Sequence, residues 1–146
     1  MRSYEQIEAQ YEALIAQWRA LCEDESIFFV AAQLSRFGAE PSAEDWPAIR
    51  AAQQAVIDGT QNAALACLLD CGEHDNVHPT DKRTPGGRLA ATALRHAYGV
   101  DVQADAPRLT GASLEGKRLI LHFANTGGGL RVPENVLASL SAEGRS

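Results

Sequence analysis

The segment NAALACLLDCGEHDNVHPTDKRTP, residues 62–85, is the strongest indication of the fold predicted for this chain. It begins with a continuous apolar run over 62–69, which is typical of a strand buried on both faces of a sheet. A polar loop follows over 70–83. Thr84 and Pro85 then form a pair that suits the cap and first turn of a helix, and the apolar spacing after them is helical.

The preceding residues show the same alternation of helix and strand. Apolar side chains at spacings of three and four predict a helix over 3–21, and the unbroken apolar run 27–32 predicts another buried strand. A second helix is predicted from a weak N-cap at Ser42 to a stop at Gly59, and the third helix ends at Gly99. This order of elements is typical of an α/β protein with a parallel sheet.

The tail of the chain follows a different pattern. Two runs rich in apolar residues flank the turn signal Glu115-Gly116, which predicts a β-hairpin. We therefore expect two parts. The first is an α/β domain over 1–106 that carries the polar loop, and the second is the start of an appended β-segment with its tail over 107–146.

Composition and charge exclude several classes of partner. The 146 residues are 45% hydrophobic and 22% charged, as in an average soluble domain. The formal charge is −6 without a Lys/Arg cluster, so neither nucleic acid nor an anionic membrane surface is an expected partner. No apolar run reaches the roughly 18 residues of a membrane span, and the polar N-terminus is unlike a signal peptide. Cys22, Cys67 and Cys71 are expected to be free thiols.

The loop over 70–83 is the candidate functional site. Ligands of open α/β sheets bind beyond the carboxyl ends of the strands, and this loop follows the second predicted strand. Pro79 favours an extended backbone at His78. Asp75, three residues earlier, is placed to accept a hydrogen bond from one imidazole nitrogen, which leaves the other nitrogen free to accept a proton. Taken alone, the pattern is also compatible with a solvated turn, because Asp, Asn and Pro are ordinary turn residues.

Several segments, in order, resemble the sialate O-acetylesterases, which belong to the serine-esterase superfamily called SGNH after its Ser, Gly, Asn and His blocks. The resemblance extends over residues 4–131 and rests on YEALIAQWRAL, IFFVAAQL, WPAIRAAQQAVI, LLDCGEHDNVHPTDK, GGRLAATALRHAYG and LILHFANTGGGL. It implies a partial SGNH-hydrolase-like fold, in which a flavodoxin-like parallel sheet lies between two layers of helices. It also implies hydrolysis of acetyl esters on sugar hydroxyls, with an O-acetylated carbohydrate such as a sialic acid as partner.

The resemblance implies roles for single residues as well. His78 accepts the proton of a serine nucleophile and returns it to the departing sugar oxygen. Asp75 fits the Asp-x-x-His spacing of the wider superfamily and is the predicted orienting carboxylate, whereas the family often has Asp at the position of Asn76. Orientation of His78 through a backbone carbonyl is the alternative. The resemblance implies no metal and no cofactor.

The block that carries the serine nucleophile has no counterpart in this sequence, because no serine lies in a Gly-Gln-Ser-type segment. We therefore expect the chain to be a truncated portion of a longer esterase, with the missing N-terminal segment supplied in cis or in trans. An unpaired sheet edge and uncovered helix faces predict self-association or marginal stability. Family members are often periplasmic or secreted, and the compartment of this chain stays open.

Other interpretations of these residues remain. The alternative function is a non-catalytic sugar- or protein-binding module derived from such an esterase. Cys71, His74, Asp75 and His78 offer metal ligands, but their spacing matches no zinc signature. Cys71 as a nucleophile is disfavoured, because acidic neighbours raise the pKa of a thiol.

Four large or charged side chains are interpreted as structural. Trp18 and Trp46 are predicted to complete apolar helix faces and pack in the core. Arg83 and Arg88 flank the loop and are predicted to be solvated cations near the start of the third helix, with contact to the carboxylate of a sialic acid as the alternative.

Overall fold

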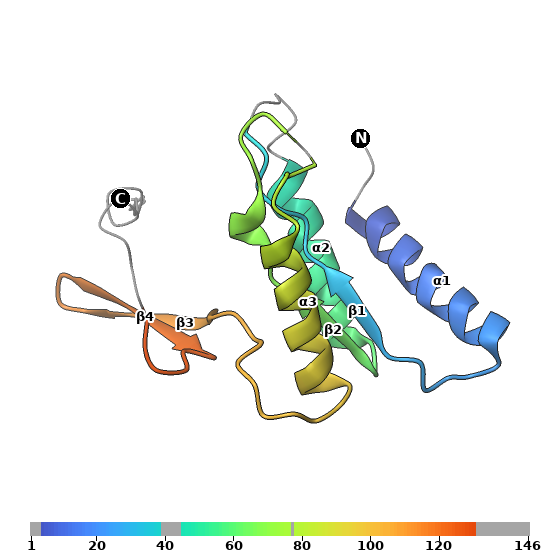
Figure 1. The fold of residues 1–146 in the computed structure, drawn as a ribbon. Helices are drawn as coiled ribbons and strands as arrows, with labels where there is room; N and C mark the ends of the chain where they lie inside the picture. Colours follow the sequence, from blue (N-terminus) through green and yellow to red (C-terminus); the bar gives the residue numbers. More distant parts are fainter. Residues whose placement is uncertain (1–3, 39–44, 77, 131–146) are drawn as a thin grey trace. The chain divides into compact units, whose positions relative to one another are not determined.

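The computed structural model describes residues 4–38, 45–76 and 78–130, and the chain divides into two compact units, Met1–Asp105 and Ala106–Ser146. The predicted cap at Ser42 lies outside the described residues. The first unit is α/β, as expected. Along the chain its elements are α1 (Tyr4–Cys22), β1 (Phe29–Ala32), α2 (Asp45–Gly59), β2 (Ala63–Ala66), the 3-10 helix η2 (Leu69–Cys71) and α3 (Arg83–His96), as Figure 1 shows.

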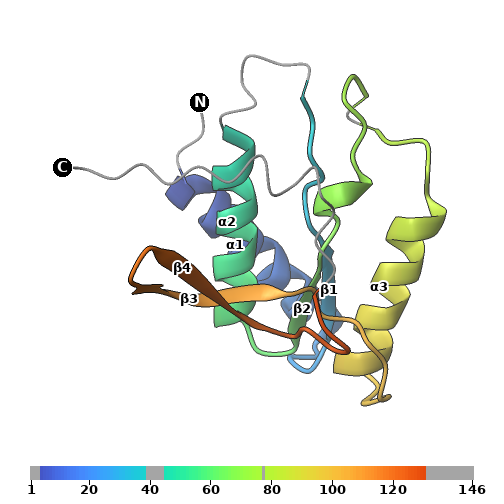
Figure 2. The same ribbon diagram turned by 90° about the vertical axis from the view of Figure 1, so that its left-hand side faces the viewer.

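The sheet of the first unit consists of β1 and β2, which pair in parallel with Phe29 opposite Ala63 and Ala32 opposite Ala66. Helix α2 is the crossover between the two strands. Figure 2 shows α3 on one side of the strands and α2, with α1 against it, on the other side. Because both strands run the same way, the loops that follow them leave from the same edge of the sheet.

The core of this unit lies between α1, α2 and β2. Its buried apolar side chains are Ile15, Ala52, Val56, Ile57, Ala64, Ala66 and Leu68. One buried polar residue, Gln53, joins three elements through its amide group. Its Oε1 accepts a hydrogen bond from the Leu34 backbone N (2.8 Å), while Nε2 donates to the Tyr11 hydroxyl (2.6 Å) and the Ala32 carbonyl (3.2 Å).

Both strands are shorter than the apolar runs predicted. β1 begins at Phe29 rather than at residue 27 and is half-buried instead of buried on both faces, because β2 is its single partner among the described strands. β2 ends at Ala66, and the rest of its apolar run turns into η2. The prediction that Trp18 packs in the core is wrong. Its side chain is 51% exposed, and it lies on a stripe of α1 with exposed Leu14 and Leu21.

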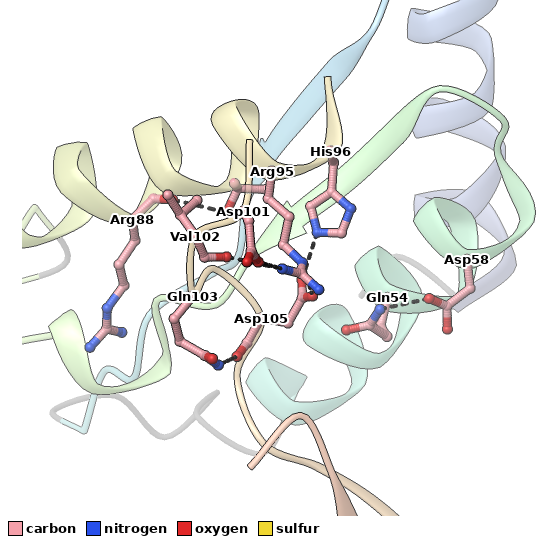
Figure 3. Close-up of polar contacts among 10 residues, drawn as sticks. Gln54, Asp58, Arg88, Arg95, His96, Asp101, Val102, Gln103 and Asp105 are labelled. Atoms are coloured by element: carbon pink, nitrogen blue, oxygen red, sulfur yellow. Dashed lines mark hydrogen bonds and ion pairs between the residues drawn. The ribbon is translucent and has the colours of Figure 1, made fainter. Parts of the chain in front are cut away.

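The end of α3 is held by its own following segment. Gly99 has a φ of +68°, which confirms it as the predicted stop. Figure 3 shows Arg95 and His96 converging on Asp105, with the Arg95 Nε 3.1 Å and the His96 Nε2 2.7 Å from its carboxylate oxygens. The segment up to Asp105 therefore returns along the end of the helix.

The second unit contains the predicted β-hairpin, made of β3 (Arg108–Glu115) and β4 (Arg118–Ala124) in antiparallel pairing. Its turn is one residue later than predicted, at Gly116-Lys117, because Glu115 pairs with Arg118 and Gly116 supplies the positive φ of +61°. One face carries exposed apolar side chains, which are Leu109, Leu114, Leu119, Leu121 and Phe123. In neither unit is any described helix both long enough and apolar enough to cross a membrane.

Candidate functional site

The loops that follow β1 and β2 run side by side beyond the sheet. Backbone hydrogen bonds continue the pairing, from the Gln33 N to the Ala66 carbonyl (3.0 Å) and from the Arg36 N to the Leu69 carbonyl (3.2 Å). A third bond joins the Gly38 N to the His74 carbonyl (3.1 Å). The polar loop over 70–83 is therefore fixed against the loop after β1, at the edge where α/β sheets bind ligands.

Two glycines permit this close approach. A Cβ at Gly72 would lie 1.8 Å from the Arg36 carbonyl oxygen, which no side chain tolerates. A Cβ at Gly38 would lie 2.9 Å from the His74 ring. Each glycine thus stands where the opposite loop occupies the space of a side chain.

The two ends of the polar loop are tied together by Arg88. Its guanidinium donates to both carboxylate oxygens of Asp70, at 2.8 Å for Nη2 to Oδ2, and Nη1 also donates to the Cys67 carbonyl (2.9 Å). The prediction that Arg88 is a solvated cation is therefore wrong, because the turn formed by η2 brings Asp70 within reach. The hydrogen bonds from Arg88 lower the pKa of the Asp70 carboxyl.

Inside the loop, Glu73 is the organising side chain. Its Oε1 accepts from the backbone N (2.6 Å) and hydroxyl (2.7 Å) of Thr80, and its Oε2 accepts from the Asn76 amide (3.1 Å). The Thr80 hydrogen bonds, chiefly, lower the pKa of Glu73. Asn76 in turn accepts a hydrogen bond from the His78 backbone N (2.9 Å). The sequence analysis assigned Glu73 no role, because no local pattern indicates that its side chain bonds to Thr80, seven residues later in the chain.

The start of α3 differs from the prediction in the same way. The Asp81 carboxylate, rather than Thr84, covers the first free backbone amides, since it accepts from the Arg83 N (2.8 Å) and the Thr84 N (3.4 Å). Pro85 lies in the first turn, as expected. The Thr84 side chain, chiefly, and the two backbone hydrogen bonds lower the pKa of the Asp81 carboxyl.

The two predicted catalytic residues are both exposed on this loop. His78 is held through its backbone by Asn76, and its imidazole is open to solvent. Within the described residues, which exclude the intervening residue 77, Asp75 is not hydrogen-bonded to His78. The role of Asp75 as orienting carboxylate therefore stays a prediction, as does proton transfer by His78.

A cavity of about 440 Å³ opens between the two loops and the start of α2. Its walls are Arg36, Phe37, Gly38, Trp46, Pro47, Arg50, Gly72, Glu73 and His74. Trp46 packs on Phe37 with ring centroids 5.9 Å apart, at a cavity wall rather than in the predicted core. Neither Asp75 nor His78 lines this cavity, whereas His74 does. The sequence signal for it is an arginine after the first strand and another at the start of the next helix.

Two of the donors at this cavity are buried and have no hydrogen-bond partner among the described residues, namely the Trp46 Nε1 and the Arg50 Nη1. Burial is the main cause that lowers the pKa of Arg50, and the positive charge of Arg36 adds to it. Two arginines that line one cavity, Arg36 and Arg50, can together accept a negatively charged group.

A metal site and a cysteine nucleophile are the alternative chemistries for this loop. Among the residues that the structure describes, no three His, Cys, Asp or Glu side chains converge as metal ligands would. Burial raises the pKa of the Cys71 thiol, which opposes a nucleophilic role at neutral pH. On the hairpin, the Ser113 hydroxyl lies 3.1 Å from the His122 Nε2, but Ser113 pairs with Ile120 and His122 with Gly111, so the two are diagonal neighbours on one face of β3 and β4.

The chain is similar to proteins of known structure. A solved structure similar to the chain is that of a carbohydrate acetylesterase from Xanthomonas citri, with a TM-score of 0.69 and 32% sequence identity. The chain is similar to a carbohydrate acetylesterase. The match covers 82% of this chain and 28% of that chain. No protein-family model and no curated protein matches the sequence.

The similarity supports an esterase family, as the sequence resemblance implies, and fits a partial hydrolase-like fold. It leaves the sialate specificity and the SGNH subtype as expectations. Because the chain spans 28% of the length of that esterase, the activity of the whole enzyme bears on this chain only as a proposal.

Proposed function

We propose that this chain is the histidine-bearing portion of a carbohydrate O-acetylesterase of the sialate O-acetylesterase type. In this proposal its α/β unit belongs to a flavodoxin-like SGNH fold with helices on both faces of a larger parallel sheet. The serine nucleophile comes from a segment outside these 146 residues, in cis or in trans. The substrate is an acetyl ester on a sugar hydroxyl, as on an O-acetylated sialic acid.

One observation carries the proposal, namely the 32% identity to a carbohydrate acetylesterase over 82% of the chain. The geometry of the loop is consistent with it. His78 stands exposed beyond the carboxyl end of β2, on a loop fixed by Glu73 and by the Asp70–Arg88 contact. A histidine held in this way is accessible to a hydroxyl group that another segment presents.

The reaction follows the general course of serine ester hydrolysis. The serine oxygen attacks the acetyl carbonyl carbon while His78 accepts its proton. The bond between the carbonyl carbon and the sugar oxygen then breaks, and His78 returns the proton to that oxygen. Water then attacks the acetyl carbon of the acyl-serine while His78 accepts a proton from it. The bond from this carbon to the serine oxygen breaks, His78 returns the proton to that oxygen, and acetate is released. Asp75 would hold the ring by a hydrogen bond that forms when the complete site is assembled.

The proposal is tested by grafting. The matching segment of the Xanthomonas citri esterase is replaced by this chain, and hydrolysis of an aryl acetate and of an O-acetylated sugar is measured beside this chain alone. We expect the chain alone to be inactive and the chimera to be active. His78→Ala in the chimera should lower kcat by at least about 10²-fold, as for loss of a general base. His122→Ala, on the hairpin, is the matched histidine control.

A folded but inactive chimera would count against the esterase proposal. Activity of the chain alone that His78→Ala abolishes would show that the nucleophile is already present here. Asp75→Asn separates the two modes of orienting His78, because only a carboxylate partner makes kcat fall while KM stays unchanged.

A non-catalytic sugar-binding module is the second candidate, and the cavity between the two loops favours it. Its volume of about 440 Å³ and its aromatic wall of Phe37 and Trp46 suit a small ligand. This candidate predicts that the chain binds sugar and that the chimera stays inactive.

A further inference from the structure

We propose that the cavity between the two loops and α2 is a binding site for the carboxylate of an acidic sugar. The carboxylate would lie between the guanidinium groups of Arg36 and Arg50, with the Trp46 Nε1 as an additional donor. The inference that the cavity binds an anion rests on its donors. The further step, that this anion is the carboxylate of a sugar, rests on the proposed function.

The unpartnered donors make the strongest case. Buried polar groups are nearly always hydrogen-bonded, because a buried donor without a partner has lost its hydrogen bonds to water and gained none in return. Arg50 and Trp46 both line the cavity, and the Arg50 Nη1 and the Trp46 Nε1 are buried without a partner among the described residues. A ligand that accepts from both, once the two side chains turn toward it, would remove this cost.

The positive charge of the cavity is not cancelled by the nearest carboxylates. Glu73 lines the cavity and is held in its charged form by neutral donors of Thr80 and Asn76, so it offsets one of the two guanidinium charges and leaves the other in excess. Asp70 feels the charge of Arg36, yet both of its oxygens accept hydrogen bonds from Arg88. Arg36 and Arg50 therefore repel one another, and an anion between them would relieve this repulsion.

Guanidinium groups favour a carboxylate as this anion, because the planar fork of an arginine matches its two oxygens. The tilted rings of Phe37 and Trp46 supply an apolar wall against which the carbon face of a sugar ring can pack. A cavity of about 440 Å³ lies within the usual size of small-molecule sites. The donors and the wall together fit a carboxylated monosaccharide better than a small inorganic anion.

The test is calorimetric titration of the 146-residue chain with D-glucuronate and with N-acetylneuraminate, which carry the carboxylate on two different sugars. The methyl ester of D-glucuronate is the uncharged match, and inorganic phosphate is the general anion. We expect saturable binding of at least one acid, and the acid that binds more tightly identifies the kind of sugar that carries the carboxylate. The methyl ester and phosphate should bind at least about tenfold more weakly, as for loss of a charge-assisted hydrogen bond.

Four variants assign the binding to the cavity. Arg36→Gln and Arg50→Gln should each weaken carboxylate binding at least about tenfold, and Trp46→Phe should weaken it less, because only one N–H is lost. Arg83→Gln removes the same charge from an exposed position outside the cavity and should bind as the parent does. If circular dichroism shows that Arg50→Gln is unfolded, Arg50→Lys, which keeps the charge without the fork, takes its place.

The inference is overturned if neither acid binds saturably, if the methyl ester binds as tightly as the acid, or if phosphate binds more tightly than both acids. Parent-like binding by both Arg36→Gln and a folded Arg50 variant overturns it too. None of the probes carries an acetyl ester, so the outcome is independent of hydrolysis. An inactive chimera with intact carboxylate binding would sink the esterase proposal alone.

Discussion

The guanidinium of Arg88 donates to both carboxylate oxygens of Asp70, and this contact closes the base of the polar loop over 70–83. The two residues lie 18 positions apart, one on α3 and the other in η2. His74, Asp75 and His78 all lie between these two residues in the chain. The contact therefore holds together the two ends of the segment that carries both histidines.

Breaking this contact should lower stability modestly. Asp70→Asn should lower the free energy of unfolding by about 1 kcal/mol, and not more, because the Asp70 side chain is 64% exposed and solvent screens the pair. Arg88→Lys should cost a similar amount, since lysine cannot bind both oxygens. Urea unfolding measures both, and Arg83→Lys is the matched control. An effect of Arg83→Lys as large as that of Arg88→Lys would contradict the assignment.

The pH dependence of the same variant has a definite sign. Arg88 lowers the pKa of Asp70 in the folded state, so the stabilisation is present above the unfolded pKa of about 3.9 and is lost as the pH falls through the lower folded value. The stability difference between the parent and Asp70→Asn should therefore be constant near pH 7 and shrink below about pH 4. A difference that grows toward acid pH would refute this.

Gly72 should be intolerant of any side chain. In Gly72→Ala the new Cβ would meet the Arg36 carbonyl oxygen at 1.8 Å, so the two loops must separate. We expect a loss of about 1–3 kcal/mol, the usual cost of overpacking, measured by urea unfolding. Gly87→Ala on α3 is the control, because nothing lies within 4 Å of its added Cβ, and helix propensity predicts a gain of about 1 kcal/mol.

Gln53 should be required for its amide rather than for its volume. Gln53→Leu leaves the Leu34 N, the Ala32 carbonyl and the Tyr11 hydroxyl without their partner. We expect a loss of about 2–3 kcal/mol for unsatisfied buried groups. The neighbouring Gln54→Leu loses only a bond to Asp58 and should change stability by less than about 0.5 kcal/mol. Equal losses of stability in the two variants would show that the hydrogen bonds of the Gln53 amide do not contribute to the free energy of unfolding.

The apolar face of the hairpin should promote self-association. Leu114 and Leu119 pair directly across β3 and β4 and are 73% and 56% exposed. We expect sedimentation velocity to show concentration-dependent association, which Leu119→Lys reduces. Ser113→Lys places the same charge on the opposite face and should leave association unchanged. A parent chain that is monomeric at every concentration would disprove the prediction.

Local patterns were sufficient to predict the class and order of the elements. The periodicity of apolar residues predicted α1, α2 and α3, and glycine and turn signals predicted the stop at Gly99 and a hairpin near Gly116, because each depends on side chains close by in the chain. The 3-10 helix η2 was not predicted. The strands were overestimated, since an apolar run does not reveal where backbone pairing ends. The exposure of Trp18 was missed for a similar reason, because burial depends on what covers a helix.

An α/β unit, a polar loop after its second strand, and the position of His78 on that loop all follow from the amino-acid pattern alone. How that loop is held, and what lies beside it, depends on how the chain packs in three dimensions. Parallel pairing of β1 with β2 brings Arg36, Arg50 and Gly72 from three separate segments to one edge of the sheet. Contacts over 14 to 36 residues depend on the pairing of the whole sheet, and no short stretch of chain encodes that pairing.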